Sequence, residues 1–266
     1  MSQLDGRAFQ DKKHALKSDA EIHIHVISPH MVDYPTSKHL LDQKEVDRGN
    51  SFAFDKDRNL YQASHVFLRR ILSQYADIPP EYWAFSCNDF GKPAIENSGQ
   101  ESLSFNLSHT HSMIACAVGY QYDLGVDIEG NQAVSNLVDM CRITLSDAEL
   151  TTVLSTLPKQ REKLFYRYWT LKEAYIKALG KGLSIPMKKI KYEIKPNGTW
   201  SCSVDFTPDI TGELYALHHN LPDNYSLALC ANVVEATELP TIRLFNWNED
   251  NNSKCLKFNV IPKHQC

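Results

Sequence analysis

Hydrophobic and polar positions follow two different periods in the first part of the chain. Residues 21–28, EIHIHVIS, alternate isoleucine or valine with glutamate or histidine, which predicts a half-buried β-strand. Its histidines, His23 and His25, share one face and form either a polar strand face, the favoured interpretation, or a metal-binding pair. Residues 61–76 place apolar side chains at helical spacing, and Pro79-Pro80 follows, so a helix is predicted to end there.

Two apolar strands are predicted in the middle of the chain. The first covers residues 103–107 and continues past Ser108-His109 into residues 113–118, and the second covers residues 124–129. Ser108 and His109 side by side can both donate to phosphate oxygens. The serine lacks a G-x-S-x-G elbow, so the pair does not indicate a serine nucleophile.

Helix signals dominate the next segment. Ser146 and Glu149 have the spacing of a capping box, which predicts a short helix that ends near Pro158. A longer helix is predicted over residues 161–179. It ends at Gly180, because glycine readily adopts the left-handed conformation of a helix terminus.

Strand patterns return after the long helix and then stop. Antiparallel strands are predicted at residues 188–195, 199–206, 213–219 and 225–234, with turns at Asn197-Gly198 and Asp223-Asn224. Strand and helix segments therefore occur on both sides of about residue 120. The predicted organisation is a polar N-terminal arm (residues 1–20), an N-terminal α/β half (21–120), a C-terminal α/β half (121–237) and a loosely attached C-terminal tail (238–266).

Composition narrows the class of protein. The 266 residues include 28 Lys and Arg against 32 Asp and Glu, a net charge of −4, without the general basic surface that sequence-independent nucleic-acid binding needs. The chain contains no apolar run near the roughly 20 residues of a membrane-spanning helix, and its first twenty residues lack the apolar core of a secretory signal. A cytoplasmic protein that binds neither nucleic acid nor membrane is expected. The seven cysteines form no C-x-x-C pair and are expected to be free thiols, mostly buried.

Candidate chemistry begins in the strand at residues 124–129. Asp127 and Glu129 leave the same face of this strand, with side chains roughly 7 Å apart. In a desolvated cleft, two ionised carboxylates need a cation or must share a proton, and Mg²⁺ suits ligation by oxygen alone. The alternative, which the residues alone favour, is a solvent-facing strand edge.

The longer predicted helix carries a second group of candidates. Glu173 and Lys177 lie opposite its apolar stripe and beside Trp169. They form either a solvated i, i+4 pair or part of a covered face or cleft, and the large aromatic side chain favours the second interpretation. Lys172, Lys177 and Lys181 would then bring three cations near one carboxylate, which suits a polyphosphate with its metal ion.

Four motifs in this order resemble one enzyme family. They are Gly91-Lys92-Pro93, FNLSH at residues 105–109, GVDIE at residues 125–129 and WTLKEAYIKALGKGL at residues 169–183. Together they closely resemble the 4′-phosphopantetheinyl transferases of the broad-specificity, surfactin-synthetase-activating type, over about residues 44–234. The resemblance implies an α/β fold of two similar halves related by pseudo-twofold symmetry, with coenzyme A bound in the cleft between them.

The resemblance also implies a reaction. Members of this family transfer 4′-phosphopantetheine from coenzyme A to a serine of an apo acyl or peptidyl carrier protein and release adenosine 3′,5′-bisphosphate. Mg²⁺, with Mn²⁺ as an alternative, is the implied cofactor, and coenzyme A is the implied substrate. The chain is expected to act as a monomer that activates carrier proteins of fatty acid, polyketide or nonribosomal peptide synthesis.

Roles for single residues follow from the same resemblance. Asp127, Glu129 and Glu173 resemble the carboxylates that hold Mg²⁺, and Asp127, Glu173 and Lys177 are the implied catalytic residues. Glu173 also matches the proposed general base, and Lys177 matches a lysine that stabilises pyrophosphate charge and protonates the leaving group. The residues implied to contact coenzyme A are Lys44, Arg48, Arg58, Lys92, Pro93, Ser108, His109, Lys172, Lys177 and Lys181.

Two other functions stay open, as does the carrier-binding surface. A magnesium-dependent phosphohydrolase would use the same carboxylates with water as the acceptor. A nucleotide-binding or scaffold protein would keep the fold and lose the activity, although the intact set of carboxylates and lysine argues against it. Basic residues that form either a docking face for an acidic carrier helix or a solvated face are Arg161, Lys163, Arg167, Lys188, Lys189 and Lys191.

Overall fold

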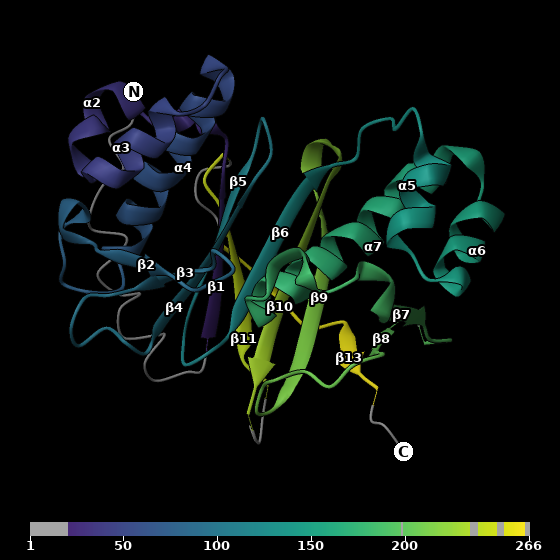
Figure 1. Ribbon diagram of the computed structural model, residues 1–266. Helices are drawn as coiled ribbons and strands as arrows, with labels where there is room; N and C mark the ends of the chain where they lie inside the picture. Colours follow the sequence, from purple (N-terminus) through teal and green to yellow (C-terminus); the bar gives the residue numbers. More distant parts are fainter. Residues whose placement is uncertain (1–20, 198, 235–238, 249–252, 264–266) are drawn as a thin grey trace. The chain divides into compact units, whose positions relative to one another are not determined.

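The computed structural model describes residues 21–197, 199–234, 239–248 and 253–263, and it divides into two compact units (Figure 1). The first unit takes its described residues from 1–86, 93–121 and 238–256, and the second from 87–92, 122–237 and 257–266. Each unit combines a β-sheet with helices, which confirms the predicted mixed α/β class. The predicted polar arm lies outside the described residues, and the predicted pseudo-twofold relation stays a prediction.

The first unit is built on a five-stranded sheet of order β12-β11-β1-β5-β4. Its strand β1 runs antiparallel to β5 and parallel to β11. A small sheet, β2-β3, accompanies it. The elements are β1 (Glu21–Ile27), α2 (Tyr34–Ser37), α3 (Gln43–Asn50), α4 (Asp55–Leu72), β2 (Phe85–Cys87), β3 (Pro93–Ile95), β4 (Leu103–His109), β5 (Ile114–Tyr120), β11 (Thr241–Asn246) and β12 (Ser253–Leu256).

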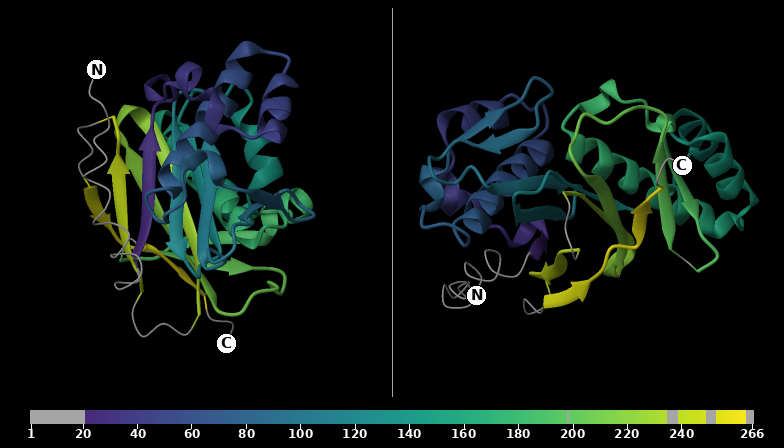
Figure 2. Two further views of the ribbon diagram at one scale, coloured as in Figure 1. Left: turned by 90° about the vertical axis from the view of Figure 1, so that its left-hand side faces the viewer. Right: turned by 90° about the horizontal axis from the view of Figure 1, so that it is seen from below.

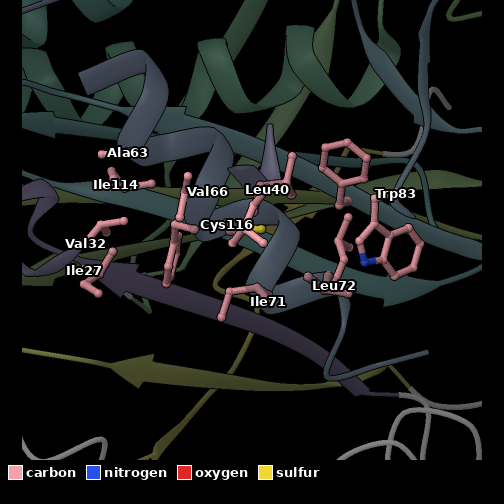
Figure 3. Close-up of a cluster of buried hydrophobic side chains, with 14 of the residues drawn as sticks. Ile27, Val32, Leu40, Ala63, Val66, Ile71, Leu72, Trp83, Ile114 and Cys116 are labelled. Atoms are coloured by element: carbon pink, nitrogen blue, oxygen red, sulfur yellow. The ribbon is translucent and has the colours of Figure 1, made fainter. Parts of the chain in front are cut away.

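Helix α4 supplies much of the core of the first unit. It begins at Asp55, earlier than the predicted start at residue 61, and buries Val66, Ile71 and Leu72 on its inner face. These side chains gather with apolar residues of β1 and β5 (Figure 3). Burying each large aliphatic side chain contributes about 1.5–3 kcal/mol, so this cluster holds the helix on the sheet.

Strand β1 departs from the predicted half-buried strand, because all seven of its residues are buried. The strand lies between β11 and β5 inside the sheet, and the burial of successive residues shows that both of its faces are covered. The polar face stays satisfied, since ring nitrogens of His23 and His25 lie 2.8 and 2.5 Å from the Tyr75 hydroxyl, and Glu21 lies 2.8 Å from His23. These contacts agree with the interpretation of His23 and His25 as a polar strand face rather than as a metal-binding pair.

Residues 103–118 form two strands, not the single strand that was predicted. Strands β4 and β5 pair antiparallel, from Leu103 opposite Tyr120 to His109 opposite Ile114. A turn closed by a 2.8 Å hydrogen bond from the Thr110 N–H to the Met113 carbonyl separates them. The prediction was wrong because apolar residues continue on both sides of this turn.

The second unit is built on a six-stranded sheet of order β6-β10-β9-β13-β8-β7. Helix α7 lies along this sheet and packs on β6, β10 and β9 (Figure 1). The elements are β6 (Leu124–Gly130), α5 (Leu137–Thr144), α6 (Asp147–Ser155), α7 (Pro158–Leu179), β7 (Ile190–Ile194), β8 (Trp200–Val204), β9 (Glu213–Leu221), β10 (Tyr225–Val233) and β13 (Val260–Pro262).

Local signals in the second unit were predicted well. The Ser146 capping box opens α6, and Gly180 ends α7 with a left-handed φ of 66°. Asp223 and Asn224 both have positive φ, which fits the turn predicted between β9 and β10. The turn predicted at Asn197-Gly198 includes a residue outside the described part of the chain.

The C-terminal segment is part of both sheets, so the prediction of a loosely attached tail was wrong. Strand β11 pairs with β1 from Thr241 to Asn246, and β12 pairs with β11 (Figure 2). Strand β13 pairs with β8 and contacts β9 in the other sheet. Strand pairing between segments this far apart in sequence leaves no local signal, and the short strands here lack a clear alternation.

The two units share a local arrangement that the sequence did not reveal. In the first, a capping box from Asp42 to Glu45 opens α3, and the Glu45 carboxylate also binds Arg69 of α4. In the second, the capping box from Ser146 to Glu149 opens α6, and Glu149 binds Lys172 of α7. In each unit a capping glutamate therefore joins a short helix to a buried cation of the long helix.

Candidate active site

The candidate site begins with the close approach of β6 to α7 in the second unit. Gly125 makes this approach feasible, because a Cβ atom there would lie 2.0 Å from the Ala174 carbonyl oxygen and 2.4 Å from the Ala178 nitrogen. No larger residue fits between the two backbones. The contact brings the Asp127 and Glu129 face of β6 against the Glu173 and Lys177 face of α7.

An ion pair joins the strand and the helix. The Lys177 ammonium lies 2.7 Å from Asp127 Oδ1 and donates to the Val126 carbonyl over 3.2 Å. The Asp127 side chain is 5% exposed and that of Lys177 is 28% exposed. Asp127 therefore lies in a covered site, and the alternative of a solvent-facing strand edge is wrong for this residue.

The other two carboxylates are held in a strongly anionic environment. Burial and the charges of Asp127 and Glu173 together raise the pKa of Glu129 to about 7, against the opposing effects of Lys177 and the indole N–H of Trp169. Burial and Asp127 also raise the pKa of Glu173, and Lys177 lowers it. The single positive charge of Lys177 thus faces three carboxylates that repel one another. An added cation would therefore be bound favourably at this site.

The donor set suits a hard divalent ion, although the ligands are not gathered into a complete cage. Three carboxylates supply only oxygen atoms, the ligand type that Mg²⁺ prefers. Among the described residues, no three His, Cys, Asp or Glu side chains are grouped closely enough to hold a metal ion. Mg²⁺ commonly keeps waters and takes substrate phosphate oxygens beside one or two carboxylates, which is compatible with this arrangement.

Lys172 does not belong to this site, which corrects the expectation that it contacts phosphate. Its side chain is fully buried, and its ammonium lies 2.6 Å from Glu149 Oε2 and 3.1 Å from the carbonyl oxygens of Thr144 and Met187. All three donor positions of an ammonium are thereby used. Lys172 and Glu173 are adjacent on a helix, so their side chains leave it about 100° apart and serve different purposes.

Two further lysines lie near the end of α7. The Lys92 ammonium donates to the Ala178 carbonyl over 2.7 Å, and burial lowers its pKa. The Lys181 ammonium lies 3.7 Å from Asp209 Oδ2 and is 39% exposed, which leaves it accessible to an anionic ligand. Pro93 begins β3, in the first unit.

The remaining residues implied to contact coenzyme A belong to the first unit. Ser108 and His109 end β4, where Ser108 is buried and His109 is exposed. Lys44 and Arg48 are exposed on α3, and Arg48 lies over the Phe52 ring. Arg58, in the first turn of α4, pairs with Asp55. These residues keep their predicted roles as proposals.

The basic residues considered for carrier binding divide into two groups. Arg161 donates to the carbonyl oxygens of Leu154 and Thr156, and Lys191 pairs with Asp205 at 2.6 Å, so both are used within the second unit. Arg167 is partly buried, with its guanidinium 5.6 Å from the centre of the Trp200 ring. The remaining basic residues are exposed. The exposed members are Lys163, Lys188 and Lys189.

Two residues that hold α7 in place, Glu149 and Asn88, were not predicted from the sequence to contact this helix. Glu149 was recognised as a capping residue, and its second role as the partner of Lys172 had no sequence signal. Asn88 was not singled out, yet its amide donates to the Gly180 carbonyl at the end of α7 over 2.8 Å. An asparagine three residues before a glycine, in a turn-rich segment, was the one available sign.

Comparison with known proteins identifies the family. Residues 27–120 match the model described as 4′-phosphopantetheinyl transferase, N-terminal, and residues 123–230 match that of the 4′-phosphopantetheinyl transferase superfamily. Together the two models span well over half of the chain. The protein therefore belongs to the 4′-phosphopantetheinyl transferase superfamily, whose members are enzymes that transfer the 4′-phosphopantetheine of coenzyme A to carrier proteins.

Two sequence relatives agree with this assignment, and one solved structure is similar to part of the chain. The 4′-phosphopantetheinyl transferase HetI of Nostoc sp. is 34% identical over 59% of this chain and 66% of its own length. The 4′-phosphopantetheinyl transferase Sfp of Bacillus subtilis is 28% identical over 72% of this chain and 87% of its own. The structure of a holo-(acyl-carrier-protein) synthase from Bacillus anthracis, in complex with CoA (3′,5′-ADP), covers 42% of this chain and 96% of that protein at 15% identity, with a TM-score of 0.37.

The described residues include no helix of the length and apolar character that crossing a membrane requires.

Proposed function

We propose that this enzyme transfers 4′-phosphopantetheine from coenzyme A to a serine of an apo acyl or peptidyl carrier protein, in a Mg²⁺-dependent reaction, and releases adenosine 3′,5′-bisphosphate. The observation that carries the proposal is the meeting of β6 and α7, where Asp127 and Glu129 face Glu173 and Lys177. The family assignment supports the reaction class.

Glu173 is proposed as the general base. Its raised pKa makes it a better proton acceptor than an ordinary surface glutamate. It takes the proton of the acceptor serine, directly or through a water molecule. The serine oxygen then forms a bond to the β-phosphorus of coenzyme A, the phosphorus that bears the pantetheine arm.

Lys177 is proposed to act on the leaving group. As the bond between the β-phosphorus and the bridging pyrophosphate oxygen breaks, negative charge develops on adenosine 3′,5′-bisphosphate. An ammonium held at a fixed place by Asp127 and the Val126 carbonyl can stabilise that charge and supply a proton. No covalent enzyme intermediate is required.

Asp127, Glu129 and Glu173 are the residues that would hold Mg²⁺. Bound there with the pyrophosphate of coenzyme A, the ion would neutralise charge on the phosphate oxygens, with Mn²⁺ as a substitute. Without it, the repulsion that raises the pKa values of Glu129 and Glu173 opposes the entry of a polyanion.

The first unit is proposed to contribute further contacts to coenzyme A. Arg58 is assigned to the 3′-phosphate, Pro93 to the loop on the adenine side, and Ser108 with His109 to the nucleotide phosphates. Lys44 and Arg48 are assigned to the same anionic part of the substrate. The chain is proposed to act as a monomer.

Intact mass spectrometry tests the reaction. An apo carrier protein is incubated with the enzyme, coenzyme A and Mg²⁺, and a gain of about 340 Da reports one phosphopantetheine group. Glu173→Gln and Asp127→Asn are expected to abolish the gain while leaving the circular dichroism spectrum unchanged. Glu193→Gln, an exposed carboxylate outside the site, is the matched control and is expected to transfer normally.

The other outcomes of this experiment would contradict the assigned residue roles or favour one of the two alternative functions. Normal transfer by the Glu173 and Asp127 variants would contradict the assigned roles. Breakdown of coenzyme A without any carrier would favour the phosphohydrolase. Binding of coenzyme A, with neither transfer to any tested carrier nor breakdown of coenzyme A, would favour the scaffold protein.

A further inference from the structure

The loop at residues 88–92 binds the end of α7 through two side-chain hydrogen bonds. The flanking strands β2 and β3 lie mostly in the first unit, whereas this loop belongs to the second unit, together with α7. The Asn88 amide donates to the Gly180 carbonyl over 2.8 Å, and the Lys92 ammonium donates to the Ala178 carbonyl over 2.7 Å. Two carbonyls at the helix terminus are thus satisfied by residues that lie 92 and 86 positions earlier in the chain.

The loop has a defined shape of its own. Asn88 Oδ1 accepts hydrogen bonds from the Phe90 and Lys92 N–H groups at 3.0 and 2.9 Å. The backbone of Asn88 exchanges further bonds, donating to the Lys92 carbonyl over 3.0 Å and accepting from the Gly91 N–H at 2.9 Å. Gly91, with φ of 86°, supplies the left-handed residue that this turn needs. The two donors are therefore presented from a closed turn.

The helix end is shaped to receive this loop. Gly180 has a left-handed φ of 66°, and a Cβ atom there would lie 2.8 Å from Lys92 Cδ and 3.1 Å from Asn88 Nδ2. The last carbonyls of a helix lack partners within the helix and carry its partial negative charge, so an amide donor and an ammonium both suit them. Burial costs the Lys92 ammonium solvation and lowers its pKa, and the bond to Ala178 with the charge of Asp123 offsets part of that cost.

This end of the helix matters because Lys177 lies in the last turn of α7. Its ammonium must stay at Asp127 and the Val126 carbonyl on β6, and frayed helix ends would release it. We propose that Asn88 and Lys92 are positioning residues for the transfer reaction, which hold the end of α7 so that Lys177 stays in place. The inference rests on the proposed function of Lys177 and differs from a role of Lys92 as a coenzyme A contact.

Asn88→Asp is the sharpest variant. It keeps the oxygen that organises the loop, and it removes the N–H that binds Gly180. Asn97 offers a matched control in the first unit, because its oxygen accepts from the Ala84 N–H and its amide donates to the Tyr82 carbonyl, both at 2.8 Å. Asn97→Asp makes the same chemical change away from α7. Lys92→Met removes the second donor, and Lys92→Arg restores a cationic donor.

Steady-state kinetics of transfer is the first readout. We expect Asn88→Asp and Lys92→Met to lower kcat about tenfold with less than about twofold change in the KM for coenzyme A, since small displacements of a catalytic group cost this much or more. Lys92→Arg is expected to recover most of the loss, and Asn97→Asp to match the wild type. In a Lys177→Met background, Asn88→Asp should cause no further loss, whereas an independent structural role would add its own.

Hydrogen exchange provides a readout that does not depend on activity. The amides of residues 177–180 are expected to exchange about tenfold faster in Asn88→Asp and Lys92→Met than in the wild type or Asn97→Asp. A raised KM for coenzyme A at constant kcat in Lys92→Met would overturn the inference and make Lys92 a substrate contact. Unchanged exchange and unchanged kcat would also overturn it. Failure of the wild type to transfer, with faster exchange in the variants, would contradict the proposed function and leave the loop's hold on α7 intact.

Discussion

Lys177 and Asp127 depend on each other at the residue scale. Lys177→Met removes the cation that lies 2.7 Å from Asp127 Oδ1 and leaves a buried carboxylate beside Glu129 and Glu173. We expect kcat for carrier modification to fall on the order of 100-fold, with a smaller change in coenzyme A affinity, because the ammonium acts on charge that develops in the transition state. Steady-state kinetics with isothermal titration of coenzyme A measures both quantities. A large loss of affinity with unchanged turnover would refute the catalytic role.

Glu129 makes stability fall as pH rises in the ligand-free protein. Its pKa is about 7 in the folded protein and 4.5 in an ordinary environment, so between these values the folded state binds more protons than the unfolded chain. The free energy of unfolding therefore decreases through this window and stays lower above it. Glu129→Gln removes the ionisation and is expected to be more stable than the wild type at pH 8, by about 1–3 kcal/mol, and equal near pH 4.5.

Urea denaturation at the two pH values, in the presence of a chelator, tests this expectation. Glu193→Gln serves as the control, because its carboxylate is exposed and pairs with Lys263, away from the site. Equal stability of Glu129→Gln and the wild type at pH 8 would show that burial and neighbouring charges do not destabilise the ionised Glu129 carboxylate.

At the scale of elements, the pair of Glu149 and Lys172 joins three segments of the second unit. Glu149 caps α6 and accepts from the Tyr192 N–H of β7, while Lys172 belongs to α7. Lys172→Met leaves the buried carboxylate without its cation and is expected to lower the free energy of unfolding by about 3–5 kcal/mol. Adding Glu149→Gln should recover part of this loss, since no buried charge then remains.

Chemical denaturation of the single and double variants measures the loss and its recovery. Coenzyme A affinity of the folded Lys172→Met protein is the second readout and is expected to match the wild type. If Lys172→Met is stable but binds coenzyme A more weakly than the wild type, the result would support the phosphate contact that the resemblance implied for Lys172.

The C-terminal segment acts at the scale of the whole molecule, because β11 and β12 complete the sheet of the first unit and β13 enters that of the second. Arg243 of β11 also pairs with the buried Glu21 at 2.7 Å. Deleting residues 239–266 exposes β1 and breaks this pair, so we expect loss of cooperative unfolding and of transfer activity. Differential scanning calorimetry of the truncated chain beside the full chain measures the change. An unchanged transition would mean that these strands add nothing to stability.

The sequence by itself determined the local features of this protein. Capping at Ser146, the end of α7 at Gly180 and the shared face of Asp127 and Glu129 all follow from the preferences of neighbouring residues. The order of the four motifs also identified the family. The inferences about capping, the helix end and the shared strand face succeeded because each depends on short-range spacing along one helix or one strand.

Only the tertiary structure decided which of these residues meet. The sequence placed Lys172 and Lys177 in one cationic group, yet burial and partners separate them, with Lys172 bound to Glu149 and Lys177 to Asp127. The pairing of β11 with β1 and the contact of Asn88 with Gly180 were equally hidden. Local spacing fixes the direction in which a side chain leaves its element, whereas packing of distant segments decides which charge it finds there and whether water can reach it.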